Sequence, residues 1–145
     1  MNNEYIVKNL ETIYEKIETL KPKEFNFNSY VEKCDKENLC GSVCCIVGWF
    51  PKWFVNSGVG WDLSDPYDLD IITPNGSYKS EVIAHLCNLT GLTEAWVKYL
   101  FYGEDSPVKN FPKLHDCSSL SEVKKAWRVT IKYFKTDPNS DYSLT

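Results

Sequence analysis

The chain has 145 residues, of which 43% are hydrophobic and 25% are charged, a composition typical of one globular domain. Its formal net charge is −4, so we expect no binding to long nucleic acids, whose backbone requires a basic surface. The sequence has no apolar run of about 18 residues, and we expect no membrane span. Because the N-terminal residues do not resemble a signal peptide, the predicted compartment is the cytoplasm. There the six cysteines are expected to be thiols or metal ligands rather than disulfides.

Residues 3–21 are predicted to form an amphipathic helix. Asn2 or Asn3 can cap its start, and Pro22 ends it. Apolar residues recur along it at spacings of four and three, namely Ile6, Leu10, Ile13, Ile17 and Leu20. We expect this single stripe to pack against the rest of its own domain.

Residues 40–50 combine a turn of small residues, three cysteines and an apolar run that carries no charge before Lys52. A short segment that is apolar on every side is typical of a buried element, so we expect this one to be the central helix of the fold. The helix is predicted over 41–57, with Ser42 as its N-cap. Pro51 removes one helical hydrogen bond, which predicts a kink or a restart there.

Three further helices are predicted in the second half of the chain. The first covers residues 79–90, and the second covers 94–102, directly before a glycine. The third begins at the capping box formed by Ser119 and Glu122 and runs to about Lys135.

Residues 58–78 are the least regular part of the sequence. The tripeptide Pro-Asn-Gly at 74–76 is a turn signal, and Leu69, Ile71 and Thr73 alternate with other residues before it. This pattern is compatible with one small β-hairpin.

The predicted fold class is therefore mainly α. We expect a compact helical single domain over residues 1–135, built around a buried central helix and with room for one small β-hairpin. Residues 136–145 are polar and are predicted to form a flexible C-terminal tail.

Three motifs of this chain follow one another in a recognisable order. Residues 27–30 read Phe-Asn-Ser-Tyr, residues 40–49 read Cys-Gly-Ser-Val-Cys-Cys-Ile-Val-Gly-Trp, and residues 91–94 (Gly-Leu-Thr-Glu) lead to Leu-Phe-Tyr at 100–102. Together they resemble a loose group of short phage and bacterial proteins with a Cys-Gly-Thr/Ser-x-x-Cys-x-x-Gly motif and a later helix ending in Leu-Phe-Tyr. Trp49 stands where many members of that group have His.

The resemblance implies a small phage-type accessory protein that acts against host defence in the cytoplasm of the host. Such proteins often sequester a nucleotide-derived signalling molecule or bind a host defence protein directly, and both alternatives stay open. We expect no enzymatic activity, and the nucleotide is the favoured partner because the chain is rich in aromatic and basic side chains.

The cysteines leave two further functional classes open. Cys40 is the best candidate for the reactive thiol of a cysteine-dependent enzyme, because a helix N-terminus lowers a thiol pKa. A zinc site that stabilises an interaction module can be drawn from Cys40, Cys44, His115 and Cys117. However, no standard zinc-finger spacing occurs, and Cys44 and Cys45 lie in the apolar segment, so we expect core packing and neither a metal nor another cofactor. His85 is expected on a polar helix face.

Basic side chains form a ridge on the last predicted helix. Lys124, Arg128 and Lys132 recur every four residues, in a chain that is acidic overall. Such a ridge is either a solvated helix face or a site for phosphate or an acidic partner.

Aromatic side chains cluster around Lys52. Trp49 is expected in the core, whereas Trp53 and Trp61 border loops and are the better candidates for ligand contact. A nucleotide needs a stacking surface for its base and cations for its phosphates. Lys52, Trp53 and Trp61 would meet that need together with the basic ridge if the fold brings the two groups together. A homo-oligomer is also left open.

Overall fold

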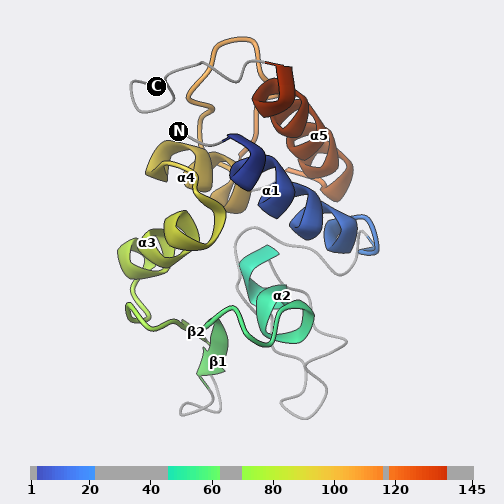
Figure 1. Cartoon of the computed structure of the whole chain (residues 1–145). Coiled ribbons are helices and arrows are strands. Elements are labelled where there is room, and N and C mark those ends of the chain that lie inside the picture. Colours follow the sequence, from blue (N-terminus) through green and yellow to red (C-terminus); the bar gives the residue numbers. More distant parts are fainter. Residues whose placement is uncertain (1–2, 22–45, 63–69, 116–117, 137–145) are drawn as a thin grey trace.

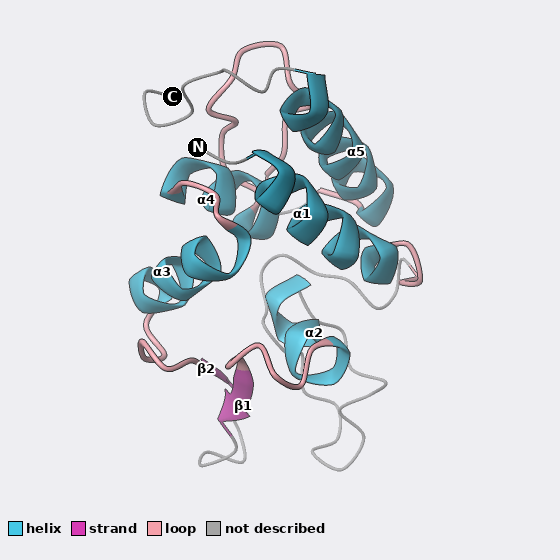
Figure 2. Ribbon diagram, viewed as in Figure 1, coloured by secondary structure: helices cyan, strands magenta, loops and turns pink. Residues whose placement is uncertain are grey.

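The computed structural model describes residues 3–21, 46–62, 70–115 and 118–136 (Figure 1). These residues form five helices and two short strands: α1 (Asn3–Ile17), α2 (Ile46–Trp53), β1 (Gly60–Asp62), β2 (Asp70–Ile72), α3 (Lys79–Thr90), α4 (Glu94–Tyr102) and α5 (Leu120–Thr136). Helices dominate (Figure 2), so the predicted mainly α fold with one small hairpin is confirmed. In the described part of the chain, no helix has the length and apolar composition needed to cross a bilayer.

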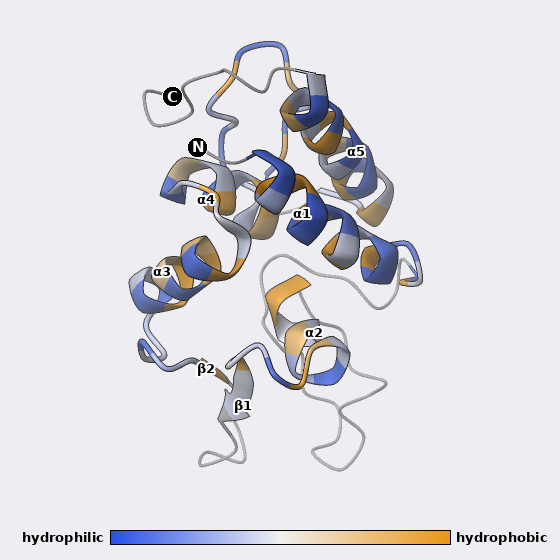
Figure 3. Ribbon diagram, in the orientation of Figure 1, coloured by the Kyte–Doolittle hydropathy of each residue, from blue (hydrophilic) through white to orange (hydrophobic). Residues whose placement is uncertain are grey.

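α1 packs lengthwise and antiparallel against α5. Near the start of α1, the Nδ2 atom of Asn3 donates to the carbonyl oxygen of Phe134, at 3.1 Å. Just beyond its other end, Nζ of Lys124 lies 3.5 Å from the carbonyl oxygen of Leu20. Both helices alternate polar and apolar segments, as Figure 3 shows, and the predicted apolar stripe is buried at Ile6, Leu10, Ile13, Ile17 and Leu20.

α1 ends at Ile17, four residues before the predicted boundary. The amides of Thr19 and Leu20 bond to the carbonyl groups three residues earlier, each at 3.0 Å, which tightens the chain into a turn. Asn3 lies inside the helix, and its side chain joins α1 to α5 rather than serving as the predicted cap. Asn2 lies outside the described residues.

α2 is buried as predicted, with Ile46–Phe50 almost inaccessible to solvent. The prediction at Pro51 was a kink or a restart. The helix continues through Pro51, so the restart is wrong, and the amide of Phe54 bonds to the carbonyl oxygen of Phe50, at 2.7 Å, across the proline. It ends at Trp53 rather than near residue 57. The predicted cap, Ser42, lies outside the described residues.

β1 and β2 pair antiparallel, with Gly60 opposite Ile72 and Trp61 opposite Ile71. The Pro-Asn-Gly turn at 74–76 follows β2 and leads into α3, so it is not the loop between the two paired strands. Thr73 and Gly76 close this turn with two backbone hydrogen bonds, of 3.0 and 2.9 Å.

α3 and α4 begin and end where they were predicted. Each ends at a glycine in the left-handed conformation, Gly91 with φ 83° and Gly103 with φ 68°. The predicted capping box of α5 is also confirmed, because the amide of Ser119 bonds to Glu122 Oε1, at 2.9 Å, and the amide of Glu122 bonds to Ser119 Oγ, at 3.3 Å.

Tryptophans hold α4 and α5 together. Trp127 is fully buried and donates from Nε1 to the carbonyl oxygen of Leu100, at 3.3 Å. Its ring packs edge to face against the Phe101 ring, with the ring centroids 5.3 Å apart. Trp96 is also fully buried and contacts the rings of Tyr99, Phe111, Tyr133 and Phe134.

We predict that Ile6→Ala lowers the free energy of unfolding by about 2 to 5 kcal/mol, because it leaves a cavity in the buried stripe of α1. Ile72→Ala is the matched control, since the Ile72 side chain is 45% exposed, and it should cost under about 1 kcal/mol. Denaturant unfolding of both variants measures the difference. Equal losses in the two variants would contradict the packing described for α1.

Burial raises the pKa of the Tyr99 hydroxyl to about 12, and this hydroxyl donates to the carbonyl oxygen of Pro112. Because folding raises this pKa, the protonated Tyr99 hydroxyl contributes to the stability of the folded state. This contribution is complete below about pH 10, where the tyrosine of the unfolded chain ionises, and it is lost as the pH rises through about 12. We therefore predict that wild-type stability falls over this range and that Tyr99→Phe shows a smaller fall. Tyr78→Phe, at an exposed tyrosine, should follow the wild type; denaturant unfolding at each pH tests this.

Candidate functional site

Three of the predicted binding residues lie together on α2 and β1. Trp53 is half-buried and stacks on the core residue Trp49, with ring centroids 5.9 Å apart and an interplanar angle of 14°. Exposed Lys52 places Nζ 5.4 Å from the centroid of the Trp49 ring. Trp61 is also half-buried and donates from Nε1 to the carbonyl oxygen of Gly48, at 2.9 Å. We call Lys52, Trp53 and Trp61 the α2 aromatic cluster.

The α2 aromatic cluster offers two partly accessible indole rings and one cation. The Trp49 ring is 2% exposed, so it is available as a support for Trp53 and not as a surface for a ligand. An indole held by stacking or by a hydrogen bond loses little side-chain freedom when a planar ligand binds to it. The cluster is therefore chemically suited to stacking a flat, weakly charged ligand.

The basic ridge lies beside α1, and two of its three side chains contact residues of α1 or of the turn that follows it. Nζ of the half-buried Lys124 lies 3.5 Å from the carbonyl oxygen of Leu20. Exposed Arg128 donates from Nη1 to the hydroxyl of Tyr14, at 3.0 Å. Lys132 is exposed, and its ammonium group has no hydrogen bond or ion pair within the described part of the chain.

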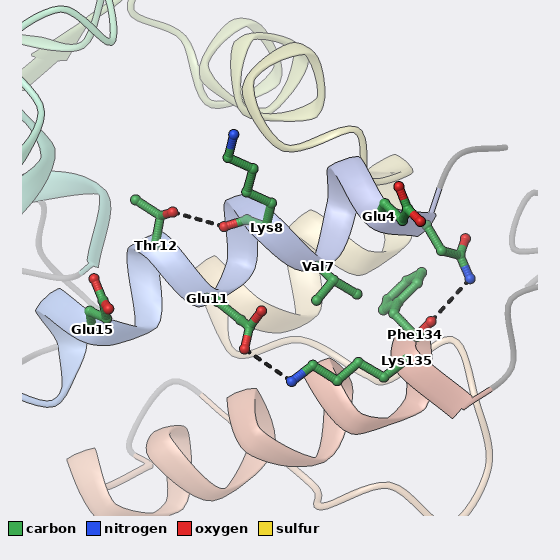
Figure 4. Close-up of a pocket in the computed structure, with 9 residues that line it drawn as sticks. Glu4, Val7, Lys8, Glu11, Thr12, Glu15, Phe134 and Lys135 are labelled. Atoms are coloured by element: carbon green, nitrogen blue, oxygen red, sulfur yellow. Dashed lines mark hydrogen bonds and ion pairs between the residues drawn. The ribbon is translucent and has the colours of Figure 1, made fainter.

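Two adjoining hollows run along the seam between α1 and α5, and together we call them the α1–α5 groove. One has a volume of about 510 Å³ and is lined mainly by Glu11, Tyr14, Glu15, Glu18, Arg128 and Lys132. The other, of about 530 Å³, shares Glu11, Glu15 and Lys135 with it. Nζ of Lys135 pairs with Oε2 of Glu11, at 3.0 Å, across the seam, as Figure 4 shows.

The structure does not bring the α2 aromatic cluster and the basic ridge into one site. In Figure 1, α1 lies between α5 and the part of the molecule that holds α2 and β1. Neither the two hollows along the α1–α5 seam nor the hollow beside the loop after α4 is lined by Lys52, Trp53 or Trp61. Lys52, Trp53 and Trp61 therefore form one candidate site, and Lys124, Arg128 and Lys132 belong to another surface.

The acidic side of the α1–α5 groove was not predicted from the sequence. Glu11, Glu15 and Glu18 recur at spacings of four and three, one step around the helix from the apolar stripe. This periodicity was a usable signal, but only the position of α5 shows that these carboxylates lie beside a basic surface.

The described histidine and cysteine side chains of α3 are structural. His85 is buried, and its Nε2 atom lies 2.7 Å from the carbonyl oxygen of Ser57, so the predicted polar face is wrong at this residue. Burial, together with the charge of nearby Glu94, raises the pKa of the Cys87 thiol. A thiol with a raised pKa is a weak nucleophile at neutral pH.

The other predicted cysteine chemistry lies outside the described residues. Cys40, Cys44, Cys45 and Cys117 belong to segments that are not described, whereas His115 is exposed. Within the described ranges, no three His, Cys, Asp or Glu side chains gather as a metal site would require. The zinc site and the reactive Cys40 thiol therefore stay untested predictions.

Comparisons of the chain with protein-family models, with curated proteins and with solved structures found no match. The resemblance to short phage and bacterial proteins accordingly stays a prediction from the sequence motifs.

We predict that Trp61→Phe lowers the free energy of unfolding by about 0.5 to 1.5 kcal/mol more than Trp53→Phe does. Trp61→Phe leaves the carbonyl group of Gly48 without its indole donor, whereas the Trp53 indole makes no hydrogen bond within the described residues. Denaturant unfolding of the two variants provides the comparison. A larger loss for Trp53→Phe would show that this hydrogen bond does not fix Trp61.

Proposed function

We propose that this is a non-enzymatic binding protein that sequesters a nucleotide-derived signalling molecule at the α2 aromatic cluster. The observation that carries the proposal is that Trp53, an indole partly open to solvent, stacks on the Trp49 ring, and that the exposed Lys52 places Nζ 5.4 Å from the centroid of the same ring. Stacking on an aromatic side chain is a sequence-tolerant way to hold a nucleobase, worth about 1 to 3 kcal/mol per base.

The charge of the cluster limits the ligand. Among the described residues of the cluster, Lys52 is the one cation, and one ammonium group can neutralise about one phosphate charge. A cyclic nucleotide carries one charge per phosphate and suits this surface better than a nucleoside triphosphate. The proposed ligand is therefore a cyclic mono- or dinucleotide.

The biological setting of this proposal comes from the sequence motifs. The likeness to short phage and bacterial proteins favours an accessory protein that acts against host defence in the host cytoplasm. A protein that sequesters a nucleotide signal binds the nucleotide without turnover.

A second candidate function is the direct capture of a host defence protein. Large apolar side chains are exposed in the segment between α2 and α3, at Val55 (78%), Ile72 (45%) and Tyr78 (77%). Where such side chains form one contiguous patch, the patch is typical of a surface that a protein partner covers.

Thermal unfolding in the presence of cyclic mono- and dinucleotides tests the proposed function. A ligand at 100 times its dissociation constant should stabilise the protein by about 2.7 kcal/mol. Trp53→Ala should weaken binding by about 1 to 3 kcal/mol through lost stacking, and Lys52→Ala should weaken it further in low salt.

The matched control is Lys132→Ala, which removes an equivalent cation from the other surface and should leave nucleotide affinity unchanged. No stabilisation by any of these nucleotides would refute the proposal. Tight capture of a host protein by the same sample would then favour the second candidate.

A further inference from the structure

The α1–α5 groove has walls of opposite charge. Glu15 and Glu18 stand on the α1 wall, whereas Arg128 and Lys132 stand on the α5 wall, and all four are exposed. Within the described residues, the carboxylates of Glu15 and Glu18 and the ammonium group of Lys132 make neither an ion pair nor a hydrogen bond. The guanidinium of Arg128 bonds to the neutral hydroxyl of Tyr14, so its charge is also unbalanced.

These charges line one hollow without pairing across it. In this hollow, of about 510 Å³, Glu11 and Lys135 form an ion pair across the seam, at 3.0 Å, whereas the charged groups of the other four residues form none. A small anion in the hollow would meet the carboxylates of α1, and a small cation would meet the basic groups of α5. The groove therefore fits a partner that carries both signs of charge on adjacent ridges.

The protein itself presents such ridges. In the hollow of about 510 Å³, α1 contributes acidic side chains and α5 contributes basic ones, and the two helices are antiparallel and similar in length, with 15 and 17 residues. A two-fold axis along the seam would bring the acidic wall of each copy against the basic wall of the other. Self-complementarity of this kind is what a two-fold symmetric interface requires.

We propose that the α1–α5 groove is the contact surface of a homodimer, in which α1 and α5 of two copies form a four-helix arrangement. In this dimer the carboxylates of Glu15 and Glu18 of one copy face the basic side chains of the other copy, Lys132 and Arg128. Tyr14 and Ile131 form the apolar base of the contact surface. The groove lies across α1 from the α2 aromatic cluster (Figure 1), so dimer formation leaves the proposed nucleotide site open.

The strength of this dimer depends on ionic strength. Ion pairs at the rim of an interface are individually weak, and salt screens them within about 10 Å at 0.1 M and about 3 Å at 1 M. Dimerisation should therefore be tightest in low salt and should weaken as salt is added.

Charge reversal in separate copies tests the proposal. Glu15→Lys alone and Lys132→Glu alone each place like charges opposite one another, twice per dimer, and each should raise the dimer dissociation constant at least about tenfold. A one-to-one mixture of the two variants restores opposite charges at both contacts. Sedimentation equilibrium in low salt should therefore show each variant as a monomer and the mixture as a heterodimer.

Two controls separate this contact from a general effect of net charge. Lys125→Glu changes the same helix outside the groove, and Asp105→Lys changes the loop after α4; neither should affect dimerisation. Thermal unfolding verifies that each variant is folded.

Three results would overturn the proposal: a wild-type protein that stays monomeric at high concentration in low salt, a dimer that resists both reversals, or a mixture that fails to associate. A monomer that still binds a nucleotide would refute the dimer and leave the proposed function intact.

Discussion

The whole fold depends on burying the apolar stripe of α1 against α5 and α3. An isolated helix of this length is marginal in water, so α1 needs tertiary packing to persist. Its partner α5 lies at the other end of the described chain, and the Asn3–Phe134 hydrogen bond spans 131 positions in the sequence. The packing of α1 on α5 brings the two ends of the described chain together and buries apolar side chains of both helices.

The position of α1 also sets the chemistry of the surface. On one side its carboxylates adjoin the basic ridge of α5, which makes a groove with two signs of charge. Across α1 lies α2, whose buried residues support Trp53 and Trp61. The protein thus presents two different surfaces, one suited to stacking a flat ligand and one suited to a charged helical partner.

Features that depend on a few neighbouring residues were predictable from the sequence. The capping box at Ser119, the glycines that end α3 and α4, and the buried stripe of α1 all follow from local hydrogen bonding and helical periodicity. Relations between distant segments were not predictable. His85 is buried because the loop at Ser57 folds over it, and no property of the α3 sequence encodes that loop.

For the candidate sites, too, the sequence predicted the residues of each group but not how the groups lie relative to one another. The residues of the α2 aromatic cluster could be chosen from their chemistry and from their nearness in sequence. The basic ridge was also correctly placed on one helix face, but its neighbour is the acidic face of α1 and not the cluster. That relation depends on how α1 is rotated against α5.

Native-state hydrogen exchange tests most directly whether the fold depends on the packing of α1 against α5. The buried amides of α1 and α5 should exchange at the same slow rate, through global unfolding. Exchange of α1 well ahead of α5 would contradict the account.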